Sequence, residues 1–164
     1  MKHQQKILSK IIEGKALFAK LEQWHKENRR IVFTNGCFDL VHRGHVEYLS
    51  AAADLGDVLI IGLNSDDSVS RLKGPHRPIL DETSRSILLA ALECVDAVVL
   101  FEEDTPLRLI REIQPDVLVK GGDYTEATIV GADVVKAKGG SIHCIPLTPD
   151  CSTSRIEAKI KNQQ

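Results

Sequence analysis

Short runs of apolar residues alternate with helix-length segments along the whole chain. Five of these runs are partly β-branched, which is typical of buried strands; they lie at residues 31–34, 57–64, 95–101, 115–121 and 141–147. The intervening and following segments have the apolar spacing of helices, at residues 44–55, 83–94, 105–113, 126–138 and 152–161. This alternation predicts an α/β fold: a single Rossmann-like doubly wound domain with a mainly parallel five-stranded sheet and helices on both faces.

Two further segments complete the outline. Within residues 13–27, Leu17, Leu21 and Trp24 have helical spacing, which predicts an amphipathic helix packed on the body. We therefore divide the chain into an N-terminal helical extension, residues 1–28, and the main domain, residues 29–164. Residues 70–82 are a polar connection with two prolines and a glycine, which predicts an irregular segment and a candidate flap over a site.

Parallel α/β sheets bind ligands outside the carboxyl ends of their strands, where strand order reverses. Four polar clusters follow the predicted strands: Thr34 to His45, Asn64 to Arg77, Lys120 to Tyr124, and Thr148 to Ser154. All four are expected to rim one crevice.

His42 and His45 flank Gly44 in the first of these clusters. Histidines so spaced can serve a metal, an acid–base pair or a phosphate, or can be ordinary turn residues. A glycine-bearing turn that opens a helix points backbone N–H groups and the positive helix end at a bound anion, which favours phosphate. A zinc site needs a third ligand such as Asp39, and no familiar ligand spacing accompanies the pair.

Other residues suit the same chemistry. The chain has neither a P-loop nor a G-x-G-x-x-G motif, so a nucleotide has to bind by another device. Lys73 can reach a phosphate as a point charge, and Ser152, Thr153 and Ser154 can cap the last helix, bind phosphate, or both. Lys120 can meet a phosphate, and Asp123 can accept a hydrogen bond from a sugar hydroxyl; an ordinary Gly-Asp turn is the competing interpretation.

Composition narrows the class of protein. The 164 residues carry a formal charge of −2 and a pI near 6.3, so there is no global basic field for nucleic acid. The four cysteines form no Cys-x-x-Cys pair, which favours reduced thiols. No apolar stretch approaches the ~20 residues of a membrane span, and the start lacks the apolar core of a signal peptide. We expect a cytoplasmic protein with no membrane or nucleic-acid partner.

The stretch GCFDLVHRGH, residues 36–45, resembles the G-x-F-D-x-x-H-x-G-H signature of the cytidylyltransferase-like nucleotidyltransferases. The resemblance covers roughly residues 29–160, with Lys73, Arg77-Pro78, Arg85, VKGGDY and CSTS in the family's order. It implies three sets of site residues. The catalytic residues are His42, His45 and Lys73; the substrate-binding residues are Arg77 and Arg85; the nucleotide-binding residues are Thr34, Asn35, Gly36, Cys37, Phe38, Asp39, Gly44, Lys120, Gly121, Asp123, Ser152, Thr153 and Ser154.

Within that family, FTNGCFDLVHRGH, LVKGGDY and DCSTS are most similar to enzymes that adenylate D-glycero-β-D-manno-heptose 1-phosphate. The resemblance implies ATP and a sugar 1-phosphate as substrates, ADP-heptose for the lipopolysaccharide core and pyrophosphate as products, and Mg²⁺ carried by ATP with no metal ligand from the protein. It also implies a homodimer. Because 164 residues leave no room for the kinase fused to this activity in many bacteria, we expect a separate sugar kinase.

One departure keeps alternatives open. Glycerol-3-phosphate cytidylyltransferases carry an R-T-E-G-I-S-T-T type motif, whereas the corresponding stretch here, TPDCSTS, has no arginine and no Glu-Gly. Arg155 and Arg85 are the candidates for the missing charge. A CTP-dependent enzyme acting on glycerol 3-phosphate or a similar phosphate monoester is the first alternative. A non-catalytic nucleotide-binding regulatory domain is the second.

Overall fold

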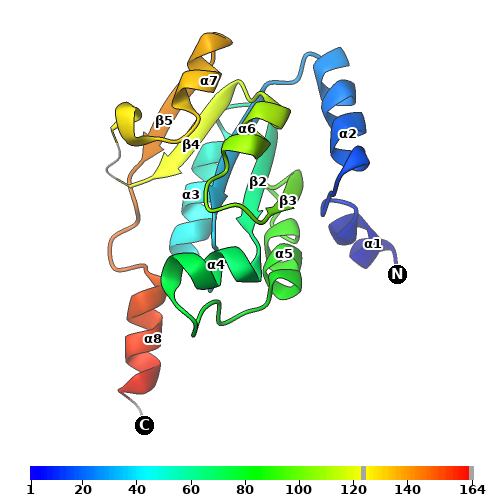
Figure 1. Ribbon diagram of the computed structural model, residues 1–164. Helices are drawn as coiled ribbons and strands as arrows, with labels where there is room; N and C mark the ends of the chain where they lie inside the picture. The colour runs from blue at the N-terminus through cyan, green and yellow to red at the C-terminus, as the bar shows by residue number, and fades with distance from the viewer. Residues whose placement is uncertain (123–124, 163–164) are drawn as a thin grey trace.

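The five apolar runs form one parallel sheet in the structure, a computed structural model that describes residues 1–122 and 125–162. The strands are β1 (Ile31–Gly36), β2 (Val58–Asn64), β3 (Ala97–Phe101), β4 (Val117–Gly121) and β5 (Ser141–Ile145). Their order is β3-β2-β1-β4-β5, so the chain builds outward from β1, then returns to β1 and builds the other way. This confirms the predicted Rossmann-like domain and places the reversal of strand order between β1 and β4 (Figure 1).

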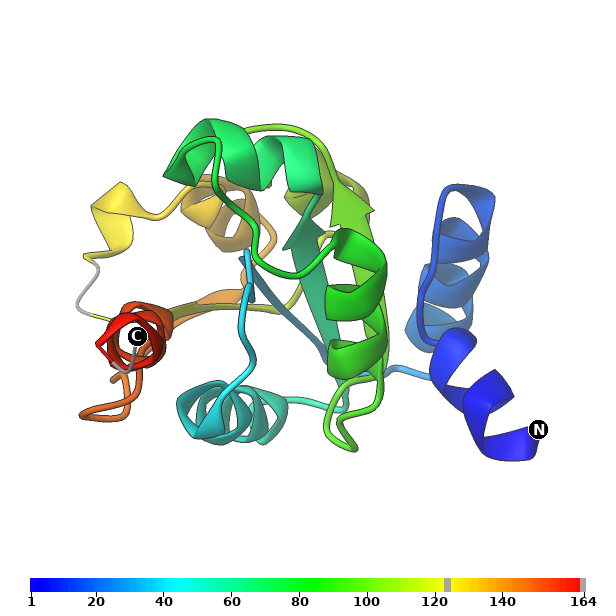
Figure 2. The ribbon, with the colours of Figure 1, turned by 90° about the horizontal axis from the view of Figure 1, so that it is seen from below.

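Helices cover both faces of the sheet, as predicted (Figure 2). One apolar cluster joins the sheet to α3 (Arg43–Ala53) and α5 (Glu82–Ala90). The other joins it to α2 (Lys15–Lys26), α6 (Leu107–Ile113) and α7 (Ala132–Ala137). Strands β1 to β4 consist mostly of buried residues, which is why they appear in the sequence as nearly unbroken apolar runs, whereas the edge strand β5 is only partly buried. None of the described helices combines the length and the apolar character needed to cross a membrane.

The N-terminal segment covers one edge of the sheet. The predicted helix at residues 13–27 is α2, and a short helix that the sequence did not predict, α1 (Lys2–Leu8), precedes it. Between them, Ile11 pairs in parallel with Val98 of β3, with Ile12 N–H donating to the Val98 carbonyl at 2.9 Å. This pairing satisfies backbone groups that an edge strand otherwise leaves open.

The prediction of an irregular segment over residues 70–82 is wrong for its first four residues and for its last, Glu82, which begins α5. The first four belong to α4 (Asp66–Lys73), which lies at the carboxyl end of the sheet (Figure 1). Ser65 caps this helix by accepting a hydrogen bond from Ser68 N–H, and Asp66 and Asp67 occupy its first turn. A serine cap and acidic residues in the first turn both stabilise the N-terminus of a helix. The helix ends at Gly74, whose φ of 100° is not helical.

The prediction of one helix over residues 126–138 is also wrong. The segment forms a short 3₁₀ helix, η1 (Glu126–Thr128), and then α7. Gly131 separates them with a φ of +83°, and a Cβ there would lie 2.6 Å from Cδ1 of Ile110. The break therefore follows from a close approach to α6 that periodicity along the segment does not reveal.

An aspartate directly precedes three of the strands and holds the start of a neighbouring strand. Each carboxylate accepts a hydrogen bond from a backbone N–H at the beginning of the next strand in the sheet, or just before it. The three contacts, each 2.8 Å from Oδ2 to nitrogen, join Asp57 to Arg30, Asp96 to Leu59 and Asp116 to Ile31. These side chains fix the register at the amino ends of the strands.

We predict that Asp96→Ala lowers the free energy of unfolding by about 1–3 kcal/mol, because it removes the partner of a buried backbone N–H. Leu59, which carries that N–H, is buried. Asp57→Ala is the matched control, since its partner belongs to the exposed Arg30, where water can replace the carboxylate; its effect should stay below about 1 kcal/mol. Urea denaturation measures both, and equal losses for the two variants would contradict the prediction.

Candidate functional site

A cleft of about 350 Å³ opens at the carboxyl ends of β1 and β4. It lies where the strand order reverses, as expected for this fold class. All four predicted polar clusters contribute to its walls. The lining residues are Asn35, Gly36, Cys37, Phe38, His42, Gly44, His45, Tyr48, Lys73, Gly121, Leu147, Thr148, Cys151, Ser152, Thr153 and Ser154.

The two histidines stack against each other at the start of α3. Their ring centroids are 3.9 Å apart and their planes differ by 26°. His42 is the N-cap residue of the helix, and its backbone N–H donates to Nδ1 of His45 at 3.4 Å. Because Nδ1 of His45 accepts this bond, a neutral His45 ring carries its proton on Nε2.

Burial disfavours the charged form of both rings. It lowers the pKa of His45 to about 4, with further lowering from the charges of His42 and Lys73 and a smaller opposing effect from the Leu40 carbonyl. Burial also lowers the pKa of His42. The Nδ1 atom of His42 is buried and has no hydrogen-bond partner among the described residues. The two rings and the first turn of α3 line the cleft together, and a helix N-terminus with unpaired backbone N–H groups is a place for an anionic ligand.

Gly44 lets the C-terminal segment cross the first turn of α3. A Cβ at this position would lie 2.9 Å from Cβ of Cys151 and 3.2 Å from Nδ1 of His42. Thr148, just before this contact, donates from its hydroxyl to Oε2 of Glu47 at 2.6 Å. Two segments more than a hundred residues apart are therefore in contact and together line one cleft.

The hydroxyl cluster begins α8 (Thr153–Lys161). Ser152 caps this helix, its Oγ accepting from Arg155 N–H at 3.2 Å, and Thr153 and Ser154 form its first turn. All three line the same cleft as the histidines. A second helix N-terminus thus faces the same space, and Lys73 enters from the last turn of α4.

Thr34, Asn35 and Lys120 connect the ends of the two central strands beneath the cleft. The ammonium of Lys120 donates to Oδ1 of Asn35, and Oγ1 of Thr34 lies 2.7 Å from the Tyr48 hydroxyl. Burial lowers the pKa of Lys120 to about 8, while the Cys37 thiol opposes this effect. Gly121 lines the cleft, where a Cβ would meet Leu147 at 3.0 Å. Asp123, also predicted from the sequence, lies outside the described residues.

Arg85 was predicted to bind substrate, but the structure commits it to the protein. The side chain is fully buried, with 0% of its surface exposed. Its guanidinium donates to an Asp66 carboxylate oxygen at 2.7 Å and to the backbone carbonyls of Cys37, Asn64 and Leu80. Four of its five N–H donors are used, so Arg85 fixes the loops around the cleft and does not line it.

Asp39 and Arg77 likewise stand behind the cleft wall. Asp39, only 2% exposed, accepts hydrogen bonds from Arg77 at 2.6 Å, Ile79 N–H at 2.6 Å and Leu80 N–H at 3.2 Å. Burial raises the pKa of Asp39, but these donors outweigh burial and the net pKa lies below its usual value. Asp39 therefore anchors the 74–81 segment.

Arg155, one candidate for the charge missing from the C-terminal motif, pairs with Asp150, and Arg85, the other, is committed as described. Sequence reasoning did not single out Tyr48 and Leu147, which line the cleft. Tyr48 lies three residues after His45 on the same helix face, a spacing that could have revealed it. Leu147 follows the carboxyl end of β5, where ligands of such sheets bind, but its apolar side chain did not mark it as a candidate for phosphate chemistry.

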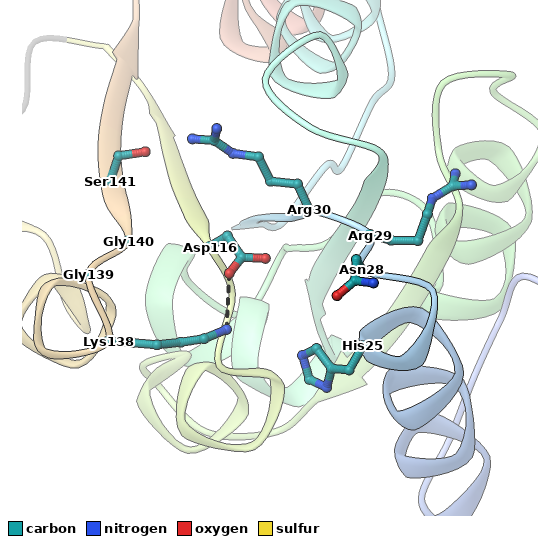
Figure 3. Close-up of a pocket in the computed structure, with 9 residues that line it drawn as sticks. All are labelled: His25, Asn28, Arg29, Arg30, Asp116, Lys138, Gly139, Gly140 and Ser141. Atoms are coloured by element: carbon teal, nitrogen blue, oxygen red, sulfur yellow. Dashed lines mark hydrogen bonds and ion pairs between the residues drawn. The ribbon is translucent and has the colours of Figure 1, made fainter.

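A second cleft, of about 480 Å³, lies at the opposite end of the strands. Figure 3 shows its lining, with His25 and Arg29 on one side and Lys138 and Ser141 on the other. Asp116 at its base is committed to Lys138 and to the start of β1. The buried side-chain atoms without partners in the described residues are His42 Nδ1 and Ser86 Oγ, and neither lies in this cleft. The first cleft is therefore the candidate site.

Among residues 1–122 and 125–162, no group of three histidine, cysteine or carboxylate side chains is placed to hold a metal ion. The donors that do face the cleft are imidazoles, hydroxyls, an ammonium and two helix N-termini. Such groups pair with the oxygens of a phosphate.

The fold and this cleft define a Rossmann-like α/β domain that takes its ligand where strand order reverses. Residues 33–158 match the family described as cytidylyltransferase-like. The chain belongs to the cytidylyltransferase-like family and is a nucleotidyltransferase.

Two of the similar proteins are both named bifunctional protein HldE. The chain is 54% identical over 151 residues to the bifunctional protein HldE of Methylobacillus flagellatus, covering 92% of this chain and 31% of that protein. It is 57% identical over 136 residues to the bifunctional protein HldE of Gluconobacter oxydans, covering 83% of this chain and 28% of that one. The chain thus spans about a third of the length of these relatives.

A solved structure has a related fold. It is a lipopolysaccharide core biosynthesis protein from Thermoplasma volcanium, with a TM-score of 0.59 and 28% sequence identity. The match covers 73% of this chain and 97% of that one.

We predict that His45 titrates near pH 4 in the free protein and carries its proton on Nε2 above that pH. Ring-nitrogen NMR, with the signal assigned by its loss in His45→Gln, measures both. Because the folded pKa of about 4 lies below the unfolded value of about 6.5, the stability that His45 contributes is complete above about pH 6.5 and declines as the pH falls toward 4. A midpoint above 6 would contradict the burial of the ring.

Proposed function

We propose that this chain transfers the AMP moiety of ATP to D-glycero-β-D-manno-heptose 1-phosphate, giving ADP-heptose and pyrophosphate. The observation that carries the proposal is the stacked histidine pair at the start of α3, which lines the cleft together with Lys73 and the first turn of α8. The choice of sugar is supported by the relatives named bifunctional protein HldE and by the related lipopolysaccharide core biosynthesis protein.

The reaction is an in-line displacement at the α-phosphorus of ATP. An oxygen of the sugar phosphate forms a new bond to that phosphorus, and the bond from the phosphorus to the bridging oxygen of the β-phosphate breaks. The electron pair leaves with pyrophosphate. A phosphate monoester is largely dianionic at neutral pH because its second pKa is about 6. The nucleophile therefore needs no general base, and the protein has to position the reactants and stabilise charge.

The residues of the cleft divide this work. His42, His45 and the N–H groups of the first turn of α3 donate to the phosphoryl group that is being transferred. Lys73 neutralises the leaving pyrophosphate as a point charge. Ser152 and the first turn of α8 hold phosphate oxygens in the same cleft. Donors aimed where negative charge accumulates are the largest contribution in reactions of this kind.

Magnesium enters with the nucleotide in this proposal. The donor set of the cleft suits anions. The two carboxylates near the histidines in sequence have protein partners: Asp39 is bound to Arg77 and two backbone N–H groups, and Glu47 to Thr148 and Arg43. The phosphate oxygens of ATP are then the ligands of the ion, which supplies further charge neutralisation when bound.

The acceptor must come from a kinase reaction, and the word bifunctional in the relatives' name fits a second activity in chains about three times as long.

Pyrophosphate release tests the proposal directly. The protein is assayed with ATP or CTP against heptose 1-phosphate, glycerol 3-phosphate and phosphoethanolamine. We expect the highest kcat/KM with ATP and heptose 1-phosphate. Turnover confined to CTP would reassign the enzyme to the cytidylyltransferases, and nucleotide binding without pyrophosphate release from any pair would indicate a regulatory domain.

We predict that His42→Asn and His45→Ala each reduce kcat/KM by about 100-fold or more, the usual cost of removing a donor to developing charge. Asparagine is chosen at position 42 because it can still cap α3. His25→Ala, which alters the second cleft at the opposite end of the sheet, is the control and should stay within about twofold of the unaltered protein. If either site variant retained near-normal kcat/KM, the histidines would have no role in transfer.

A further inference from the structure

Arg77 joins three separate walls of the cleft through two ion pairs. Its Nη1 donates to Oδ2 of Asp39 at 2.6 Å, in the segment that follows β1. Its Nη2 donates to Oε2 of Glu157, in the second turn of α8. Arg77 itself lies in the 74–81 segment, which continues from Lys73. One guanidinium thus spans the segments that carry the histidines, the lysine and the hydroxyl cluster.

The two ion pairs are not equally permanent. The side chain of Asp39 is 1% exposed and has two further backbone donors, so breaking that pair would leave a buried charge uncompensated. The side chain of Glu157 is 30% exposed, so water can take over when its pair opens. The Arg77–Glu157 pair is therefore the one that can open, with water replacing the partner of each side chain.

Few other contacts hold α8. None of its described residues is buried, and its N-cap, Ser152, directly follows Cys151, the residue that packs on Gly44. Its first turn nevertheless carries Ser152, Thr153 and Ser154 into the cleft. The position of these donors depends on what fixes the helix, and the Glu157 carboxylate, one turn further along, is bound to the rest of the cleft through Arg77.

We propose that Arg77 is a positioning residue and that its pair with Glu157 is a latch, which holds the start of α8 over bound nucleotide and opens when ligand exchanges. The proposal rests on nucleotidyl transfer in this cleft but not on the identity of the sugar. It reassigns Arg77, which sequence reasoning had placed among substrate-binding residues, to a contact between protein segments.

The fork of the guanidinium makes this role specific to arginine. Two carboxylates on different segments are bound by separate N–H groups of one planar side chain. A lysine at the same place is a single point charge and cannot hold both in fixed directions. Arg77→Lys should therefore keep the pair with the buried Asp39 and lose the latch.

The chain also provides a matched control. Glu157 makes a second pair, from Oε1 to the ammonium of Lys161 at 3.0 Å, on the exposed side of α8. Lys161→Gln removes one positive partner of Glu157 but leaves the bridge to Arg77 intact. Glu157→Gln removes the charge and keeps the shape of the side chain.

The test compares Glu157→Gln, Arg77→Lys and Lys161→Gln by two measurements on the full chain. Steady-state kinetics gives KM for the nucleotide and kcat. Amide hydrogen exchange followed by mass spectrometry gives the opening of α8 in the free protein, corrected for the intrinsic rates of each sequence. We expect the first two variants to raise KM about threefold to fivefold, the range of a partly exposed ion pair, with kcat unchanged or higher. Exchange in α8 should accelerate by a similar factor, and Lys161→Gln should change neither quantity.

The latch is overturned if Glu157→Gln leaves KM and exchange unchanged, or if Lys161→Gln has the same effect as Glu157→Gln. A fall in kcat at constant KM would instead give Arg77 a direct part in the chemical step and would also overturn it. If the unaltered protein releases no pyrophosphate with any nucleotide and acceptor, the proposed function fails, and the exchange measurement alone decides whether Arg77 holds α8.

Discussion

The reversal of strand order between β1 and β4 is the constraint on which the site depends. The connections from these two central strands leave in opposite directions, so a space opens above their carboxyl ends that no crossover helix fills. The turn after β1 then brings the start of α3 to one side of this space, and the chain after β5 returns across the other. The histidine pair and the hydroxyl cluster line one cleft for this topological reason.

Polar residues around that space fall into two groups with different duties. His42, Lys73 and Ser152 line the cleft with donors. Arg85 and Asp39 have almost no exposed surface, and both form hydrogen bonds with the backbone of the loops. Loops at a strand end have backbone groups that no sheet or helix satisfies, and a buried charged side chain with several such partners fixes them in one arrangement. The rigidity of the cleft thus comes from residues that a ligand does not reach.

The sequence predicted most of what depends on local pattern. Strands buried on both faces appear as apolar runs, and the spacing of His42, Gly44 and His45 located the first wall of the cleft. It did not predict partners distant in the chain. Arg77 meets a residue 38 positions before it and another 80 positions after it, and no spacing within the loop indicates either contact. For the same reason the break at Gly131 follows from Ile110 on another helix.

Burial of the histidine pair sets how its charge can respond to a ligand. Placing two cations side by side in a partly buried site is unfavourable without an anion, so burial and mutual repulsion keep His45 deprotonated in the free protein. A phosphate group supplies the missing negative charge and raises the proton affinity of both rings. The site becomes more positive only as negative charge arrives, so the interaction is strongest where that charge is greatest. In the proposed transfer, donors that gain positive charge as negative charge accumulates favour the transition state over the ground state.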